Sequence, residues 1–278
     1  MTKVLGCAGL VLLFAGGAFA DIVVNGSLSD WGVTPGSQWH NSIGASEWIE
    51  TAVGSDGYVG PGYGGQLFNV EAMYAFANST NFYYAIVTGF PETDTTYNGT
   101  KYSPGDVLFD LIPSYVPSGS TTPTGRMEFA VETTTYDANH THGGKGNITP
   151  SQGAGSFYSD VGLGLAVDLW DNVYYPVEIA RSGSNNTADG TLVGQTLFTY
   201  NDTYYGSDHY VIEGSIPLSY FGGADVQKAT LIWAMTCSND IGSLQIGPFS
   251  NVPEPGTLLL LGSGSLVGAG CWLRRRMT

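Results

Sequence analysis

The apolar residues of this chain occur in short runs, and glycine, asparagine, aspartate and proline separate most of them. Ten runs have the length and the β-branched and aromatic content of strands: 21–24, 71–77, 82–88, 107–112, 127–134, 161–168, 174–180, 195–200, 210–216 and 230–237. Helical periodicity is scarce, and 40 of the 278 residues are glycine, which is unfavourable in helix interiors. The pattern predicts an all-β fold, an antiparallel β-sandwich of the jelly-roll or immunoglobulin-like kind.

Two of these runs predict different kinds of burial. Residues 82–87 read FYYAIV and are apolar at every position, so they predict a central strand that is packed on both faces. Residues 127–132 read MEFAVE and alternate between apolar and polar side chains, so one face of that strand is expected to be wet. Trp31 and Trp233 lie in or beside apolar runs and are expected in the core.

The charge and the motifs of the chain exclude several functions. Nine basic and 24 acidic residues give a net charge of −15, and such a chain repels nucleic-acid phosphates. Residues 21–252 contain no zinc-protease, P-loop or G-x-S-x-G motif. The acid pairs Asp168/Asp171 and Glu128/Glu132 are of a kind that an acidic chain produces by chance. We therefore expect a protein that is not an enzyme, with an extracellular glycoside hydrolase as the less favoured alternative.

The first 20 residues have the order of a secretory signal peptide. Lys3 precedes an apolar run, and Ala18-Phe19-Ala20 is an A-x-A cleavage site. Cleavage after Ala20 makes Asp21 the first residue of the mature chain. Residues 1–20 therefore predict a signal helix, and residues 21–252 a single β-sandwich domain.

The other end has the properties of a membrane anchor. After Val252-Pro253-Glu254-Pro255, residues 256–273 carry no charge, and they are followed by Arg274, Arg275 and Arg276. As a helix with a rise of about 1.5 Å per residue, the uncharged stretch spans roughly 27 Å, enough for the core of a bilayer. The arginines hold the C-terminal side in the cytoplasm, so the domain before this transmembrane helix is expected to face outward.

Residues 253–278 resemble the PEP-CTERM sorting signal of bacterial exosortase substrates. The resemblance rests on three parts in the same order, namely Pro-Glu-Pro, a hydrophobic helix and a basic end. It implies that the helix is a transient anchor and that an exosortase cleaves the chain near residues 253–255. The released domain would then reach the cell surface or the exopolysaccharide matrix of a biofilm-forming bacterium.

A second resemblance lies inside the domain. Residues 24–31 (VNGSLSDW), 78–87, 105–110 and 210–217 (YVIEGSIP) are similar, in this order, to segments of family 9 carbohydrate-binding modules and the related DOMON-like sandwiches. Asn25 stands where that pattern usually has aspartate. The resemblance implies a sandwich of the binding type, in some members with a structural calcium ion, and does not by itself identify a ligand.

Three tryptophans are the candidates for ligand binding. An indole ring can stack on a sugar ring. Trp39 and Trp48 lie in the glycine- and serine-rich segment between the first two expected strands, and Trp170 lies next to Asp168 and Asp171. The alternative is that all three cover the core. The chain is therefore expected to be a surface or matrix protein with a binding or structural role, whose partners are an exosortase and exopolysaccharide or other surface components. A carbohydrate-binding module with a defined sugar pocket is the alternative.

No cofactor is expected, apart from a structural calcium ion that the acidic loops would suit. Residues 92–94 and 202–208, together with Asp30 and Asp106, offer the oxygen atoms that this ion prefers. Their spacing matches no known calcium loop, so no metal ligand is assigned. His140 and His142 are interpreted as part of a solvated loop.

Overall fold

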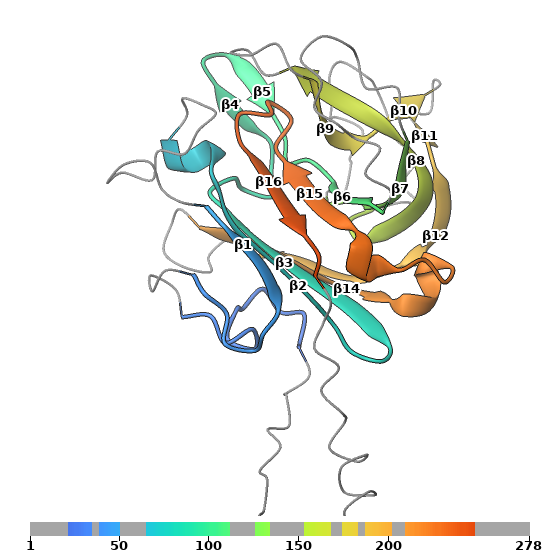
Figure 1. Cartoon of the computed structure of the whole chain (residues 1–278). Helices are drawn as coiled ribbons and strands as arrows, with labels where there is room; N and C mark the ends of the chain where they lie inside the picture. Colours follow the sequence, from blue (N-terminus) through green and yellow to red (C-terminus); the bar gives the residue numbers. More distant parts are fainter. Residues whose placement is uncertain are drawn as a thin grey trace, which may run out of the picture. The chain divides into compact units, whose positions relative to one another are not determined.

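Two antiparallel sheets form the described part of the chain (Figure 1). The structure is a computed structural model, and it describes residues 22–34, 39–50, 65–111, 126–133, 153–167, 174–182, 187–201 and 209–247. All of these residues belong to one structural unit, Ile22–Phe249.

The first sheet has five strands. Its order is β1 (Ser46–Ile49), β2 (Val70–Ala77), β3 (Asn81–Thr88), β14 (Tyr210–Pro217) and β13 (Leu197–Asn201). The second sheet has the order β12 (Thr191–Gln195), β8 (Ser156–Val167), β7 (Arg126–Val131), β6 (Val107–Asp110), β15 (Thr230–Ala234) and β16 (Ile241–Gln245), with β9 (Tyr174–Ile179) paired to β8.

Two small ribbons and three short helices complete the described elements. The ribbons are β4 (Thr95–Tyr97) with β5 (Thr100–Tyr102), and β10 (Arg181–Ser182) with β11 (Thr187–Ala188). The helices are the 3₁₀ turns η1 (Gly65–Phe68), η2 (Leu218–Phe221) and η3 (Val226–Lys228). Over the described residues, no helix has the length and hydropathy needed to cross a membrane. The expected signal helix and C-terminal transmembrane helix lie outside these residues.

Nine of the ten predicted runs contain a strand, so the all-β, antiparallel prediction is confirmed. The exception is the first run, because residues 22–24 form no strand. Strands β1, β12 and β16 of the two sheets were not predicted, and neither were the ribbon strands β4, β5, β10 and β11. Two of them, with the sequences TLVGQ and IGSLQ, include glycine and few β-branched residues, so their strand signal is weak.

The two sheets share one hydrophobic core, which is consistent with the expected β-sandwich. Phenylalanine rings from both sheets and from η2 meet there. Phe129 stacks on Phe157 with 5.4 Å between ring centroids, and the edge of Phe221 meets Phe129 at 5.1 Å. Trp233 is fully buried, as expected, and its Nε1 donates to the carbonyl of Gly105 at 2.9 Å.

Strand β3 is buried on both faces, as its uninterrupted apolar sequence predicts. One face points into the shared core, and the other packs against the N-terminal segment, residues 22–34. Leu28 and Trp31 of that segment are fully buried against the sheet. Trp31 therefore lies in the core, as predicted.

Strand β7 has only part of the wet face that its alternating sequence predicts, because Glu128 is partly exposed whereas Ala130 and Glu132 are buried. Met127 and Ala130 pack into a cluster on the outer face of the second sheet, together with Ile179 of β9. Glu132 is fully buried as well, because it forms an ion pair with Arg181. The alternating sequence predicts that Glu132 is exposed, but this side chain, just after the end of β7, is compensated by a buried partner.

Glu213 attaches the N-terminal segment to the first sheet. This carboxylate is fully buried in β14 and accepts hydrogen bonds from the backbone N–H groups of Asn25 (2.9 Å) and Gly26 (2.8 Å) and from Nε1 of Trp31 (2.8 Å). Gly26 has a φ of +75°, and a Cβ there would lie 2.4 Å from Cβ of Asn201. These contacts leave residues 25 and 26 without the freedom to pair as a strand.

Replacing Trp31 by phenylalanine should destabilise the domain by about 1–3 kcal/mol, because one buried oxygen of Glu213 then lacks its donor. Urea unfolding of the purified protein measures the change. A double-mutant cycle with Glu213→Gln separates the hydrogen bond from the lost indole volume. The half-exposed Val23→Ala should change stability by less than about 0.5 kcal/mol. Additive effects of Trp31→Phe and Glu213→Gln would contradict this role for the carboxylate.

Candidate functional site

The structure places two of the three candidate tryptophans, and both are half buried. Trp39 packs against the hydrophobic cluster on the outer face of the first sheet, whereas Trp48 packs against the core between the sheets. The two indoles therefore lie on opposite faces of that sheet and do not form one platform. The other candidate residues lie outside the described part of the chain: Trp170, Ala18, Ala20, Asp21, Val252, Pro253, Glu254, Pro255, Arg274, Arg275 and Arg276.

Trp39 is held in an unusual backbone conformation. Its φ of +59° lies in the left-handed region, which bulky side chains rarely occupy. The hydroxyl of Tyr74, a residue of β2, donates a hydrogen bond to the carbonyl oxygen of Trp39. The indole centroid lies 5.9 Å from the imidazole centroid of His209, just before β14.

Glu71 and Gln66 extend this contact into a polar group. Nδ1 of His209 lies 2.7 Å from Oε1 of Glu71, and Nε2 of Gln66 contacts the same oxygen and lies 3.2 Å from that nitrogen. Glu71 is nearly buried, and burial raises its pKa, while His209 and Gln66 act in the opposite direction. Trp39, Gln66, Glu71 and His209 are called the Trp39 cluster below.

The Trp39 cluster combines one apolar ring with hydrogen-bonding groups that are already oriented. His209 and Trp39 are partly accessible, whereas Glu71 supports them from inside. Such a combination suits a neutral ligand with both C–H and hydroxyl groups. Of the four residues, only Trp39 was predicted from the sequence, because the other three become its neighbours through strand pairing.

Two further carboxyl groups lie near Glu71. The backbone N–H of Glu50 donates to the carbonyl of Glu71 at 3.0 Å, and Asp240 accepts from the N–H groups of Val70 (2.5 Å) and Ile241 (2.8 Å). Burial raises the pKa of Asp240 to about 7. Burial, followed by the charges of Asp240 and Glu71, raises the pKa of Glu50 to about 8.

Three of the acidic residues that would suit a calcium ion have other partners in the structure. Asp30 accepts from the N–H of Val23 at 3.2 Å, and Asp94 contacts Lys101 and Ser103. Asp106 is buried on backbone N–H groups, and residues 202–208 lie outside the described part. Within the described ranges, no group of three histidine, cysteine, aspartate or glutamate side chains has the geometry to hold a metal ion.

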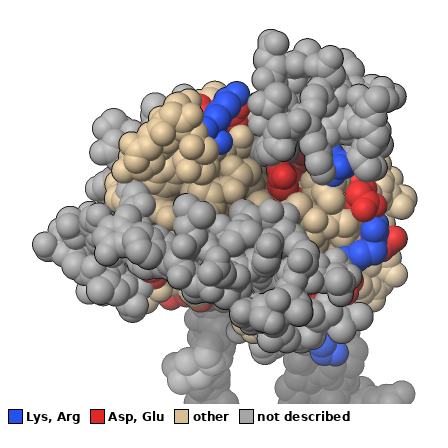
Figure 2. Space-filling model, turned by 90° about the horizontal axis from the view of Figure 1, so that it is seen from above, with Lys and Arg blue, Asp and Glu red and all other residues tan. Residues whose placement is uncertain are grey.

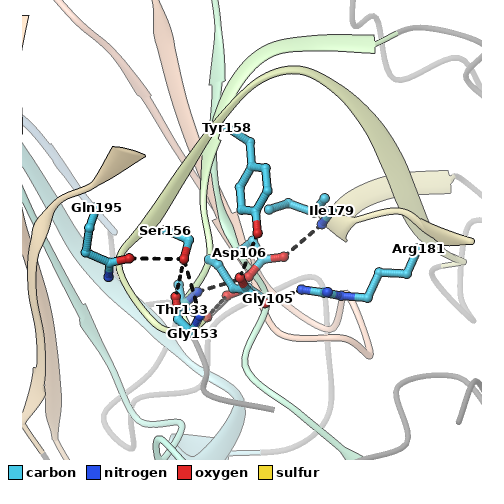
Figure 3. A network of polar contacts seen from close by, with 10 residues as sticks. Gly105, Asp106, Thr133, Gly153, Ser156, Tyr158, Ile179, Arg181 and Gln195 are labelled. Atoms are coloured by element: carbon cyan, nitrogen blue, oxygen red, sulfur yellow. Dashed lines mark hydrogen bonds and ion pairs between the residues drawn. The ribbon is translucent and has the colours of Figure 1, made fainter. Parts of the chain in front are cut away.

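A second polar network is buried under the second sheet, and Figure 3 shows it from close by. Asp106 accepts from the N–H groups of Thr133 (3.0 Å) and Ile179 (2.8 Å), so it joins β6, the end of β7 and β9. Arg181 pairs with Glu132, whose other oxygen lies 3.3 Å from the hydroxyl of Tyr158. Burial raises the pKa of Glu132 to about 7, although Arg181 lowers it. This network connects strands and is closed to a substrate-sized ligand by its burial.

The acid pair Glu128/Glu132 does not have the placement of a glycosidase pair. Four residues of strand separate the two side chains by roughly 13 Å, which exceeds the ~5–9.5 Å that glycoside hydrolysis uses. Glu132 is ion-paired, and Glu128 accepts from the N–H of Leu111 at 2.9 Å. The pair Asp168/Asp171 lies outside the described residues.

All four basic side chains that the structure describes are paired with acids. The pairs are Lys101–Asp94, Arg126 with Asp160 and Asp189, Arg181–Glu132 and Lys228–Asp225. On the face drawn in Figure 2, charged side chains form small, separate groups among uncharged atoms. The described surface therefore presents no cluster of unpaired cations for an anionic ligand.

The raised pKa values of Glu50 and Asp240 predict that the free energy of unfolding falls between pH 5 and pH 8. The folded protein keeps the protons of Glu50 and Asp240 to about pH 8 and 7, whereas the unfolded chain loses them near 4.5 and 3.8. Their contribution to the free energy of unfolding is complete below the pKa values of the unfolded chain. It is lost as the pH rises through the pKa values of the folded protein. Each group adds at most about 1.4 kcal/mol per pH unit to the slope, and the half-exposed Glu50 adds less.

Glu50→Gln should therefore flatten the dependence of unfolding free energy on pH in this window and raise stability at pH 8. Denaturant titrations at pH 5, 6, 7 and 8 measure the slope. Glu47→Gln is the matched control, because the pKa of Glu47 is lowered and its charge does not change in this range. An unchanged slope in Glu50→Gln would show that Glu50 is ionised throughout.

Comparison with known proteins identifies the C-terminal segment. Residues 251–276 match the family model of the PEP-CTERM protein-sorting motif. No curated protein and no solved structure gives a significant match, so the resemblance of the domain to family 9 carbohydrate-binding modules and DOMON-like sandwiches gains no support. The motif implies exosortase-dependent sorting to the cell surface, and it confirms that this chain carries a PEP-CTERM sorting signal at residues 251–276.

Proposed function

We propose that this chain is an exported, non-catalytic protein whose β-domain serves a binding or structural role at the cell surface or in the exopolysaccharide matrix. The single observation that carries the proposal is the PEP-CTERM motif at residues 251–276. A sorting signal of this kind is useful only if the segment before it remains intact after the anchor is removed. The end of the described domain supports this requirement.

The last described residues are tied into the fold before the motif begins. The N–H of Ile246 donates to the carbonyl of Ala229 at 2.9 Å, and the N–H of Gly247 donates to Oγ of Ser46 at 3.1 Å. Cleavage near Pro253 would remove none of these contacts. The domain can therefore keep its core when the hydrophobic segment 256–273 is separated from it.

The use of the buried acids favours a role without catalysis. Glu213, Asp106 and Asp240 each accept two backbone N–H groups, so their oxygens are committed to holding chain segments together. A general acid or base must instead reach a substrate. In the proposed role, the acidic side chains serve the fold and solubility, and neutral polar and aromatic surface makes the contacts.

Processing can be read from the mass of the mature protein. We expect protein recovered from the host surface to begin at Asp21 and to end near Pro253. Alanine at Pro253, Glu254 and Pro255 should retain the hydrophobic segment and leave the protein in the membrane fraction. Intact-mass spectrometry of both forms gives the termini, and deletion of the exosortase is the control. Recovery of a surface protein that still contains Arg274, Arg275 and Arg276 would contradict the proposal.

Sugar binding at the Trp39 cluster is a second candidate function. The observation that favours it is the half-buried indole of Trp39 beside His209 and Glu71, which combines a stacking surface with hydrogen-bonding groups. Trp48 does not take part in this cluster, because it lies on the other face of the sheet. The two indoles can therefore be separated by mutation.

Trp39→Ala should weaken binding to exopolysaccharide by about tenfold or more, which corresponds to about 1.4 kcal/mol. Trp39→Phe should restore part of the affinity, since it keeps an aromatic face. Trp48→Ala is the matched control and should bind as the parent does. Affinity electrophoresis in host polysaccharide measures the effect, and near-ultraviolet circular dichroism confirms folding. Equal losses in Trp39→Ala and Trp48→Ala would exclude the cluster as the sugar site.

A further inference from the structure

The chain contains two Asn-Gly pairs, Asn25-Gly26 and Asn98-Gly99, and both asparagines are exposed. In such a pair the backbone nitrogen of the glycine can attack the side-chain amide before it, because glycine has no side chain to block the approach. The attack requires that this nitrogen loses its proton to base and that the backbone rotates to close a ring. The two pairs differ in both respects.

The pair Asn25-Gly26 is locked into the fold. The N–H of Gly26, a buried residue, donates to Oε2 of Glu213 at 2.8 Å, so its proton is shielded from water. Oδ1 of Asn25 accepts from the N–H of Ser27 at 2.8 Å, and Nδ2 of Asn201 donates to the carbonyl of Gly26 at 3.3 Å. Rotation at Asn25 would break these hydrogen bonds and lift the N-terminal segment off the sheet, so ring closure is costly there.

The pair Asn98-Gly99 is the loop of the ribbon formed by β4 and β5, at the top of Figure 1. Tyr97 faces Thr100 across the ribbon, and the φ values of Asn98 (+50°) and Gly99 (+81°) are both positive, as a two-residue type I′ turn requires. Both loop residues are exposed. Within the described part of the chain, no hydrogen bond involves the side chain of Asn98 or the N–H of Gly99. The proton that must be lost is therefore open to water.

The ribbon can open at this loop at low cost. Ring closure needs rotation about the Cα–C bond of Asn98, out of the turn geometry. β4 and β5 form three residue pairs, and among the described strands they pair with no other. An isolated two-stranded ribbon is only marginally stable, so its loop opens more readily than a segment that is docked on a sheet. Phe68 contacts Tyr97 and Tyr102, with 5.4 and 5.7 Å between ring centroids, and these contacts hold the strands rather than the loop.

We propose that Asn98 is a site of spontaneous deamidation. The nitrogen of Gly99 bonds to Cγ of Asn98, the bond between Cγ and Nδ2 breaks, and Nδ2 leaves as ammonia with the proton that Gly99 has lost. Water then opens the resulting succinimide ring at either of its two C–N bonds and yields aspartate or isoaspartate. The co-reactant is water alone.

Either product changes the tip of the ribbon. Aspartate and isoaspartate both add a negative charge there, and isoaspartate also lengthens the main chain of a loop whose strand register fits two residues. The product accumulates with time, because hydrolysis of the amide is irreversible in water. On a surface-displayed domain, position 98 would therefore record the age of the protein. This inference does not depend on sugar binding at the Trp39 cluster.

The exported protein, purified from its host and held in mildly alkaline buffer made with heavy-oxygen water, tests this proposal. Water that opens the ring leaves a heavy oxygen atom in the product, so peptide mapping by mass spectrometry measures new conversion at each pair. In the folded protein, Asn98 should convert at least about tenfold faster than Asn25, because the opening it needs costs less. In urea the two rates should become similar, because the pairs are then followed only by Ser27 and Thr100 in an unfolded chain.

Two variants separate the chemistry from the fold. Asn98→Gln keeps an amide but would have to close a larger ring, so it should give no product at position 98. Glu213→Gln weakens the hold on Gly26 and should speed conversion at Asn25 while the rate at Asn98 stays as in the parent. Near-ultraviolet circular dichroism shows that each variant is folded. Equal rates at Asn25 and Asn98 in the folded parent would overturn the proposal, and so would an Asn98 that converts in urea but stays intact in the folded protein.

Discussion

Buried carboxyl groups of this domain accept hydrogen bonds from backbone N–H groups at the ends of strands and in the segments that cover the sheets. Glu213 attaches residues 25 and 26 to the first sheet, Asp106 joins residues 133 and 179 beneath the second, and Asp240 receives the N–H of Val70. In each case one buried carboxyl side chain accepts from backbone donors that would otherwise be buried without a partner. The covering layers on both sheets depend on these contacts, and the hydrophobic clusters beneath them depend on the covering layers.

This use of carboxylates explains how so acidic a chain tolerates so many buried acids. Burial raises the pKa values of Glu213, Asp106 and Asp240, while backbone hydrogen bonds act in the opposite direction. Glu132 obtains its compensation from the buried guanidinium of Arg181 instead. The few basic side chains that the structure describes are therefore occupied, and what the domain presents outward is mainly uncharged or acidic.

The sequence predicted the strands better than it predicted their surroundings. Nine runs were recognised because strand formation is a local property of alternating or continuous apolar residues. The errors came from partners that are distant in the chain. The sequence of residues 22–24 is typical of a strand, but Glu213 accepts hydrogen bonds from the N–H groups of residues 25 and 26. The sequence predicts that Glu132 is exposed, but this side chain forms a buried ion pair with Arg181. The Trp39 cluster could be predicted only at Trp39 for the same reason, since His209 is brought to it by the order of the strands.

The sorting signal and the surface of the domain depend on the sequence in different ways. The signal consists of neighbouring residues, so it can be recognised without a fold. The domain instead assembles a candidate recognition surface by folding, and among the described residues the Trp39 cluster is such a surface once the buried acids and paired cations are set aside. This cluster favours a partner without dense negative charge, because the described surface has no unpaired cation cluster to receive one.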